Sequence, residues 1–161
     1  PLYLDVPAGR VVIEMRPDLA PAHVAQIKAL ARKGFYDGIV FHRVIDGFMA
    51  QTGDVQYGNM SKGFDPSLAG TGGSDLPNIP AEFSKTPFVR GTVGMARSQD
   101  PDSANSQFFI MFADGSFLNG QYTVVGKVVS GMEFVDKIKK GEGQNGEVSN
   151  PDRMVKVTVA K

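Results

Sequence analysis

The residues with the clearest chemical character lie in one short run, residues 41–54, with the sequence FHRVIDGFMAQTGD. The run sets one arginine, Arg43, and one amide, Gln51, among large apolar side chains. It contains no nucleophile–base pair and no spacing typical of metal ligands. A fixed cation, an amide and an apolar pocket can bind and twist a substrate, but they are poorly equipped to break a covalent bond. The run therefore predicts a site that works without covalent chemistry, metal or cofactor.

Bulk properties narrow the class of protein. A chain of 161 residues with 42% hydrophobic and 21% charged residues fits one globular domain, residues 1–161, with a substantial core. The 17 basic and 17 acidic residues give a net charge of +0, which argues against nucleic acid or an anionic membrane as the main partner. No cysteine is present, so neither disulfides nor thiolate chemistry are available.

We expect a monomer. We also expect a cytoplasmic location, because no apolar run reaches transmembrane length and no signal-like segment opens the sequence. The sequence begins at Pro1, so a periplasmic location would follow if a signal peptide had been removed.

Short strands dominate the expected secondary structure. Alternation and turn residues predict strands at residues 2–6, 10–15, 39–45, 48–51, 92–96, 107–111, 122–129 and 154–159. A glycine-rich, polar region separates the fourth and fifth of these, from about residue 52 to 91. The predicted class is therefore mainly β.

Two helices are expected, at residues 21–33 and 132–140. Pro21 and Gly34 delimit the first, while Ser130 would cap the second and Gly141 would stop it. His23, early in the first helix, is expected to be exposed. Two helices are too few to separate every strand pair as βαβ units require. The economical solution is a closed antiparallel eight-stranded barrel with the two helices covering its ends.

The run 41–54 closely resembles the signature segment of the cyclophilins, the peptidyl-prolyl cis–trans isomerases. Further segments that resemble this family follow in the same order, at 70–73 (GTGG), 94–97 (GMAR), 105–110 (NSQFFI), 117–120 (FLNG) and 124–128 (VVGKV). The resemblance covers nearly the whole chain. It implies an eight-stranded barrel capped by two helices, and isomerisation of X–Pro bonds in proline-containing polypeptides, which assists protein folding.

The resemblance also implies roles for individual residues. Arg43 would donate a hydrogen bond to the prolyl nitrogen when the amide is twisted, and Gln51 would hold the substrate backbone and help to orient Arg43. The substrate-binding set would comprise Phe48, Met49, Phe109 and Leu118 as the proline pocket, with Ile45 beneath it, and Ala96, Arg97, Ser98, Gln107, Gly70, Phe117, Tyr122 and His42 around it. His42, which faces away from Arg43 on an extended strand, is expected to support the site and not to shuttle a proton.

Three positions depart from the best-known eukaryotic pattern. Phe117 stands where many relatives have Trp, so the indole N–H donor is missing and cyclosporin should bind only weakly. Phenylalanine at this position also favours a bacterial origin. Tyr122 replaces a frequent His and Arg97 a frequent Asn, which would alter substrate preference.

Residues 55–69 form a longer loop than compact relatives have. It carries Tyr57, Met60 and Phe64 close to the glycine-rich segment, so it could form a flap beside the groove. The alternative is a solvated insertion without consequence.

Two other functions remain to be weighed. A non-catalytic proline-binding or chaperone module could use the same groove, but such a module would not need a cation aimed at the prolyl nitrogen. A hydrolase triad could be drawn from Ser103 or Ser106 with His42 and Asp54, although no strand–elbow–helix pattern surrounds these residues.

Overall fold

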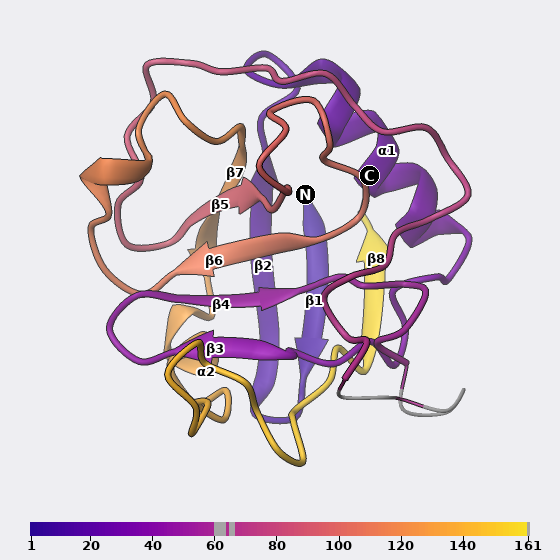
Figure 1. Cartoon of the computed structure of the whole chain (residues 1–161), viewed down its shortest axis with the longest axis vertical. Coiled ribbons are helices and arrows are strands. Elements are labelled where there is room, and N and C mark those ends of the chain that lie inside the picture. Colours follow the sequence, from indigo (N-terminus) through magenta and orange to yellow (C-terminus); the bar gives the residue numbers. More distant parts are fainter. Residues whose placement is uncertain (60–63, 65–66, 161) are drawn as a thin grey trace.

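The computed structural model describes residues 1–59, 64 and 67–160. Its eight strands form one antiparallel sheet in the order β3-β4-β6-β5-β7-β2-β1-β8, which curls around a hydrophobic interior (Figure 1). The strands are β1 (Leu2–Val6), β2 (Gly9–Met15), β3 (Arg43–Ile45), β4 (Met49–Thr52), β5 (Thr92–Met95), β6 (Phe108–Met111), β7 (Val124–Ser130) and β8 (Lys156–Val159). The predicted mainly β, eight-stranded antiparallel architecture is confirmed.

The barrel closes through a short seam. The two outer strands, β3 and β8, share no ladder within the described part of the chain. The segments that precede them meet instead, because the Phe41 N–H donates to the Asp152 carbonyl at 2.8 Å and the Met154 N–H donates to the Ile39 carbonyl at 2.8 Å. The predicted closed barrel is therefore joined at this seam by a few hydrogen bonds and not by a continuous ladder between β3 and β8.

This seam also explains one difference from the predicted strands. Residues 39–45 were expected to form one continuous strand, but only Arg43–Ile45 does so as β3. Ile39 and Val40 form isolated bridges to Asn59 and Arg153. β1 has its predicted bounds, and the remaining strands differ from expectation by one or two residues at their ends.

The first helix, α1 (Pro21–Arg32), begins with proline and packs on β8. Its buried face contains His23, Val24, Ile27, Leu30 and Ala31. The expectation that His23 is exposed is wrong. Ala20 offers no capping side chain, and the Glu82 carboxylate accepts the His23 N–H at 2.9 Å and lies 2.5 Å from the ring Nδ1.

The second helix, α2 (Met132–Asp136), is shorter than predicted. It starts after Gly131, not after a Ser130 cap, because Gly131 adopts φ 85° and a Cβ there would lie 2.4 Å from the Arg10 carbonyl. It ends well before Gly141, because the Lys139 N–H donates to the Asp152 carboxylate at 2.9 Å and so leaves the helical pattern. The helices lie at opposite ends of the curled sheet in Figure 1, α1 at the upper right and α2 at the lower left, and both contribute to the interior cluster.

Two hydrophobic clusters organise the interior, and β6 contributes to each. Phe108 and Ile110 point into the barrel, whereas Phe109 and Met111 belong to a smaller outer cluster with Leu118. Successive side chains of a strand face opposite ways, so one strand serves both clusters. None of the helices in the described residues is long and apolar enough to span a membrane.

Candidate active site

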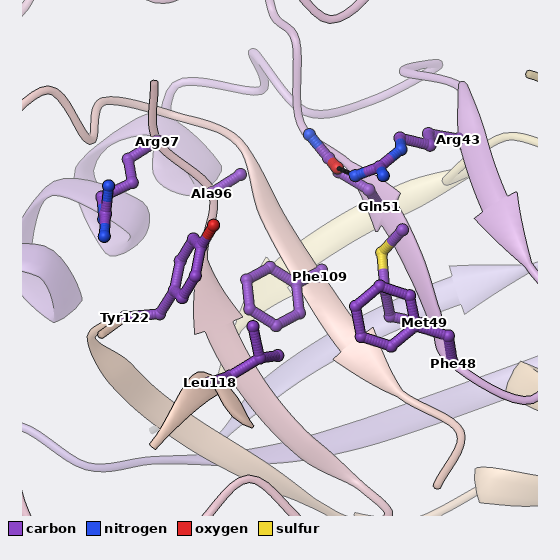
Figure 2. Close-up of a pocket in the computed structure, with 9 residues that line it drawn as sticks. All are labelled: Arg43, Phe48, Met49, Gln51, Ala96, Arg97, Phe109, Leu118 and Tyr122. Atoms are coloured by element: carbon purple, nitrogen blue, oxygen red, sulfur yellow. Dashed lines mark hydrogen bonds between the residues drawn. The ribbon is translucent and has the colours of Figure 1, made fainter. Parts of the chain in front are cut away.

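A pocket opens over the outer cluster, where β3, β4 and β6 meet the loops that follow β5 and β6 (Figure 2). Its volume is about 130 Å³. It is lined by Arg43, Phe48, Met49, Gln51, Ala96, Arg97, Phe109, Leu118 and Tyr122. All nine belong to the set of site residues expected from the sequence, so residues far apart in the chain do meet at one place.

The floor of the pocket is apolar and well supported. Phe109 stacks on Phe88 with ring centroids 5.8 Å apart and meets Tyr122 edge-on at 5.9 Å. Met49 and Leu118 complete the buried floor, with Phe48 half-buried beside them. The floor can therefore hold a compact apolar ring without moving.

Arg43 forms one wall of the pocket. Its cross-strand neighbour in the β3–β4 register is Gln51, whose Oε1 accepts a hydrogen bond from Nη1 at 3.2 Å. The Arg43 Nε donates to the Asn145 carbonyl at 2.8 Å. Among the described residues no carboxylate forms an ion pair with Arg43. The guanidinium is thus oriented but not neutralised.

A chain of hydrogen bonds through two side-chain amides supports this orientation of Arg43. The Gln51 Nε2 donates to the Gln107 Oε1 at 3.0 Å, and the Gln107 Nε2 donates to the carbonyls of Gly70 and Gly72, each at 2.9 Å. Gln107 and Gly70 line a second hollow of about 250 Å³ next to the pocket, together with Ser98. The expected peptide-contacting residues therefore divide between two adjoining hollows, which share Gln51, Ala96 and Arg97.

Arg97 stands on the far side of the pocket from Arg43 (Figure 2). Its Cζ lies 4.5 Å from the centroid of the Tyr122 ring, and its Nε and Nη2 donate to the Gln121 carbonyl at 3.1 and 2.6 Å. Its Nη1 donates to the Ser98 carbonyl at 2.9 Å. Its N–H groups are thus mostly bonded to backbone carbonyls, so we expect Arg97 to shape the rim of the pocket and not to donate to a substrate.

Three of the expected residues line neither the pocket nor the second hollow. Phe117 is 69% exposed at the rim, with its ring 5.5 Å from that of Phe48. Ile45 packs against the outer cluster. His42 is buried behind Arg43 and lines a different hollow with Phe64 and Gly70.

The environment of His42 keeps it neutral. Burial lowers the pKa of His42 to about 4, an effect that Asp54 opposes and Arg43 reinforces. Neither ring nitrogen has a hydrogen-bond partner among the described residues. His42 therefore has the setting of a supporting residue, not of a proton carrier.

The hydrolase triad does not assemble. The Ser106 hydroxyl donates to the Gly53 carbonyl at 2.7 Å and the Ser103 hydroxyl to the Asp100 carbonyl at 2.6 Å. No group of three metal-ligand side chains converges within the described ranges. Of the segment 55–69, Met60 lies outside the described residues, while Phe64 faces the hollow behind Arg43. The flap stays a prediction.

Comparisons with known proteins agree with this geometry. A sequence profile of the family described as "Cyclophilin type peptidyl-prolyl cis-trans isomerase/CLD" matches residues 2–159. A probable peptidyl-prolyl cis-trans isomerase of Brucella suis is 71% identical over 159 residues, which cover 98% of this chain and 81% of that protein. Peptidyl-prolyl cis-trans isomerase B of Escherichia coli is 40% identical over 139 residues, covering 81% and 79% of the two chains.

Solved structures support the same assignment. A cyclophilin from Hirschia baltica superposes with a TM-score of 0.80 at 27% identity, covering 98% of this chain and 72% of that one. A cyclophilin-type isomerase of Cryptosporidium parvum, crystallised in the presence of the dipeptide ala-pro, gives 0.82 at 23% identity, covering 99% and 98%, which speaks for the fold alone. The chain belongs to the cyclophilin family of peptidyl-prolyl cis–trans isomerases. The predicted family and enzyme class are confirmed.

Proposed function

We propose that this isomerase lowers the barrier to X–Pro rotation by donating a hydrogen bond from Arg43 to the prolyl nitrogen of the twisted amide. The observation that carries the proposal is the oriented guanidinium on the pocket wall, which has no carboxylate partner within the part of the chain that the structure describes. Of the five N–H groups of an arginine, two are used by Asn145 and Gln51, and the other three have no acceptor among the described residues and are available to a substrate.

The physics of the amide explains why such a donor accelerates rotation. The planar X–Pro amide has a barrier of ~18–20 kcal/mol because its C–N bond has double-bond character. At the twisted midpoint the nitrogen becomes pyramidal and gains a lone pair that can accept a hydrogen bond. Arg43 would interact far less with the planar ground state, and only this difference raises the rate. Each tenfold in rate requires ~1.4 kcal/mol of such differential stabilisation.

The floor formed by Met49, Phe109 and Leu118 would hold the prolyl ring, while Gln51 would hold the substrate backbone. That the Cryptosporidium relative was crystallised in the presence of the dipeptide ala-pro is in line with a proline-containing ligand. The substrates would be proline-containing segments of unfolded or flexible chains, whose isomerisation limits slow folding steps. We also propose that the enzyme is a monomer in the bacterial cytoplasm. Light scattering would test the oligomeric state, and cell fractionation would test the location.

The decisive experiment replaces Arg43 by Ala. We expect R43A to lower kcat for a short X–Pro peptide on the order of a hundredfold, the scale for loss of one preorganised donor. The affinity for a proline peptide should change much less, because the apolar floor remains. NMR exchange spectroscopy measures the rate, and titration of the same peptide measures the dissociation constant.

Arg97→Ala serves as the matched control, since it removes a second cation from the same pocket. Its loss should raise KM and leave kcat nearly unchanged, because its donors are bound to backbone carbonyls. If R43A instead weakened peptide binding as much as it slowed isomerisation, the groove would be a binding or chaperone module and the arginine mechanism would be wrong.

A further inference from the structure

Asp54 is a fully buried carboxylate that follows β4 and accepts four backbone hydrogen bonds. Its Oδ1 accepts from the N–H groups of Gln56 at 3.0 Å and Tyr57 at 2.9 Å. Its Oδ2 accepts from Gly70 at 2.8 Å and Gly72 at 3.0 Å. The carboxylate thereby ties the glycine-rich segment 70–72, far along the chain, to the end of the strand that carries Gln51.

The fit between this segment and the carboxylate is close. A Cβ on Gly72 would lie 2.5 Å from the Asp54 Oδ1, nearer than atoms approach without displacement. A Cβ on Gly70, where φ is 97°, would lie 3.0 Å from the His42 Nε2. The two glycines therefore allow the backbone to reach Asp54, and charge-assisted bonds then hold it there.

The position of this segment decides how the Gln107 amide is turned. The Gly70 and Gly72 carbonyls both point at the Gln107 Nε2. A flipped amide would set its oxygen against two carbonyl oxygens, which repel it. The oxygen is left to face Gln51, which must then present its own Nε2 to Gln107. The Gln51 Oε1 in turn faces Arg43 and accepts from Nη1.

We infer that Asp54 is a positioning residue for catalysis: its carboxylate fixes the carbonyls of residues 70 and 72, and through Gln107 and Gln51 it fixes the direction of the Arg43 guanidinium. The inference rests on the proposed function, since it gives Asp54 a role only if the direction of Arg43 matters. Asp54 itself does not line the pocket.

The experiment compares Asp54→Asn with the native enzyme. An asparagine replaces one acceptor oxygen by an N–H₂ donor, so one pair of backbone N–H groups loses its partner. We expect kcat to fall about tenfold to a hundredfold, the scale on which a small misplacement of a reacting group is felt. The dissociation constant of a proline peptide should change much less, because Phe109 and Leu118 stay in place.

Asp37→Asn is the matched control. The Asp37 carboxylate also accepts a backbone N–H, that of Val157 at 2.9 Å, but it lies outside the pocket. Each variant is assayed at a temperature well below the midpoint of its thermal unfolding, so that a loss of stability is not mistaken for a loss of activity. D37N should keep the native kcat. If D54N does not fold, Gly72→Ala displaces the same carboxylate from the opposite side and should show the same loss of kcat.

A double-mutant cycle with Arg43→Ala separates positioning from a general structural role. If Asp54 acts through Arg43, D54N should slow the native enzyme but not the R43A enzyme further. The Arg43 Nε–H and the side-chain amide resonances of Gln51 and Gln107 should shift in D54N and stay in place in D37N.

The inference would be wrong if D54N lowered kcat by the same factor in the native and in the R43A enzyme. It would also be wrong if D54N were as fast as D37N while R43A was slow. Either result would leave the proposed function of Arg43 intact. An R43A enzyme as fast as the native one would overturn the proposed function, and the inference with it.

Discussion

His42 and Arg43 are neighbours in the chain, yet their surroundings give them opposite properties. Arg43 lines the pocket and its guanidinium has N–H groups available, whereas the His42 ring is buried and neither of its nitrogens has a hydrogen-bond partner among the described residues. Taking a charged imidazole out of water is costly, which is why the pKa of His42 falls from 6.5 to about 4. The cost of burying a charged His42 should make the free energy of unfolding depend on pH.

Between pH 6.5 and 4 the unfolded chain binds a proton at His42 more readily than the folded chain does. The free energy of unfolding should therefore fall as the pH falls through this window, by at most ~1.4 kcal/mol per pH unit. Urea denaturation at several pH values measures it. His42→Leu should flatten the slope in the upper part of this window, toward pH 6.5, where carboxyl groups with ordinary pKa values near 4.5 are already ionised. Equal slopes in the two proteins would contradict the assignment.

We expect Phe117 to control a second residue-level property, the response to cyclosporin. The family resemblance places this position against the drug, and the exposed ring of Phe117 has no N–H to offer. Phe117→Trp should tighten cyclosporin binding about fivefold, the value of one net hydrogen bond. Isothermal titration measures the affinity. Phe83→Trp, at another exposed phenylalanine that does not line the pocket, is the control and should have no effect.

At the level of elements, β5 lies directly behind the pocket floor. A Cβ on Gly94 would lie 2.6 Å from the Phe88 ring and 2.7 Å from the Phe109 ring. The two rings are stacked, so neither can move without the other. Glycine is therefore needed at this point of β5 for the floor to keep its place.

Gly94→Ala should push Phe109 toward the pocket and weaken proline-peptide binding about tenfold, with a loss of stability of about 1–3 kcal/mol from overpacking. Titration and urea denaturation measure the two effects. Val93→Ala, the next residue of the same strand, removes contacts in the barrel interior and should destabilise the fold with little change in affinity. A similar loss of affinity in V93A would mean that the floor is not specifically affected.

Most strands and helices could be predicted from the local sequence, but some of their ends and caps could not. The strand predicted at residues 107–111 lies within one residue of β6, and Pro21 marked the start of α1 correctly. The start of α2 at Met132 was predicted correctly, but its cap was assigned to Ser130, whereas Gly131 takes that position close to the Arg10 carbonyl. A local sequence pattern cannot reveal a contact with a residue that is distant in the chain.

The same limit applies to the site. The resemblance brought the pocket residues together in advance, but the contact of His23 with Glu82 joins residues 59 apart, and Asp54 reaches Gly70 across 16 positions. Asp54 was considered only as part of a hydrolase triad. A buried acid directly after a strand, with several glycines further on, was the signal that could have suggested its true contacts.

At the level of the whole molecule, the seam between residues 38–41 and 152–154 decides whether the barrel behaves as one unit. The N–H groups of Phe41 and Met154 cross this seam. If the sheet unfolds as one unit, these amides should exchange with deuterium only through global unfolding, as slowly as those of β6. Hydrogen exchange followed by NMR tests this.

The Asn119 N–H, which donates to the Ser116 carbonyl in a surface turn, is the fast-exchanging reference. Seam amides that exchanged as fast as Asn119 would show that the sheet opens there while the rest stays folded.

The division of the pocket into a buried floor and an exposed rim has a consequence for how this enzyme can diverge. Met49, Phe109 and Leu118 belong to a hydrophobic cluster, so mutation of any of them threatens folding and turnover together. Phe117, 69% exposed, can change with little effect on folding. New preferences among clients, or resistance to a drug, would therefore arise at the rim, in lineages whose proline-holding centre stays the same.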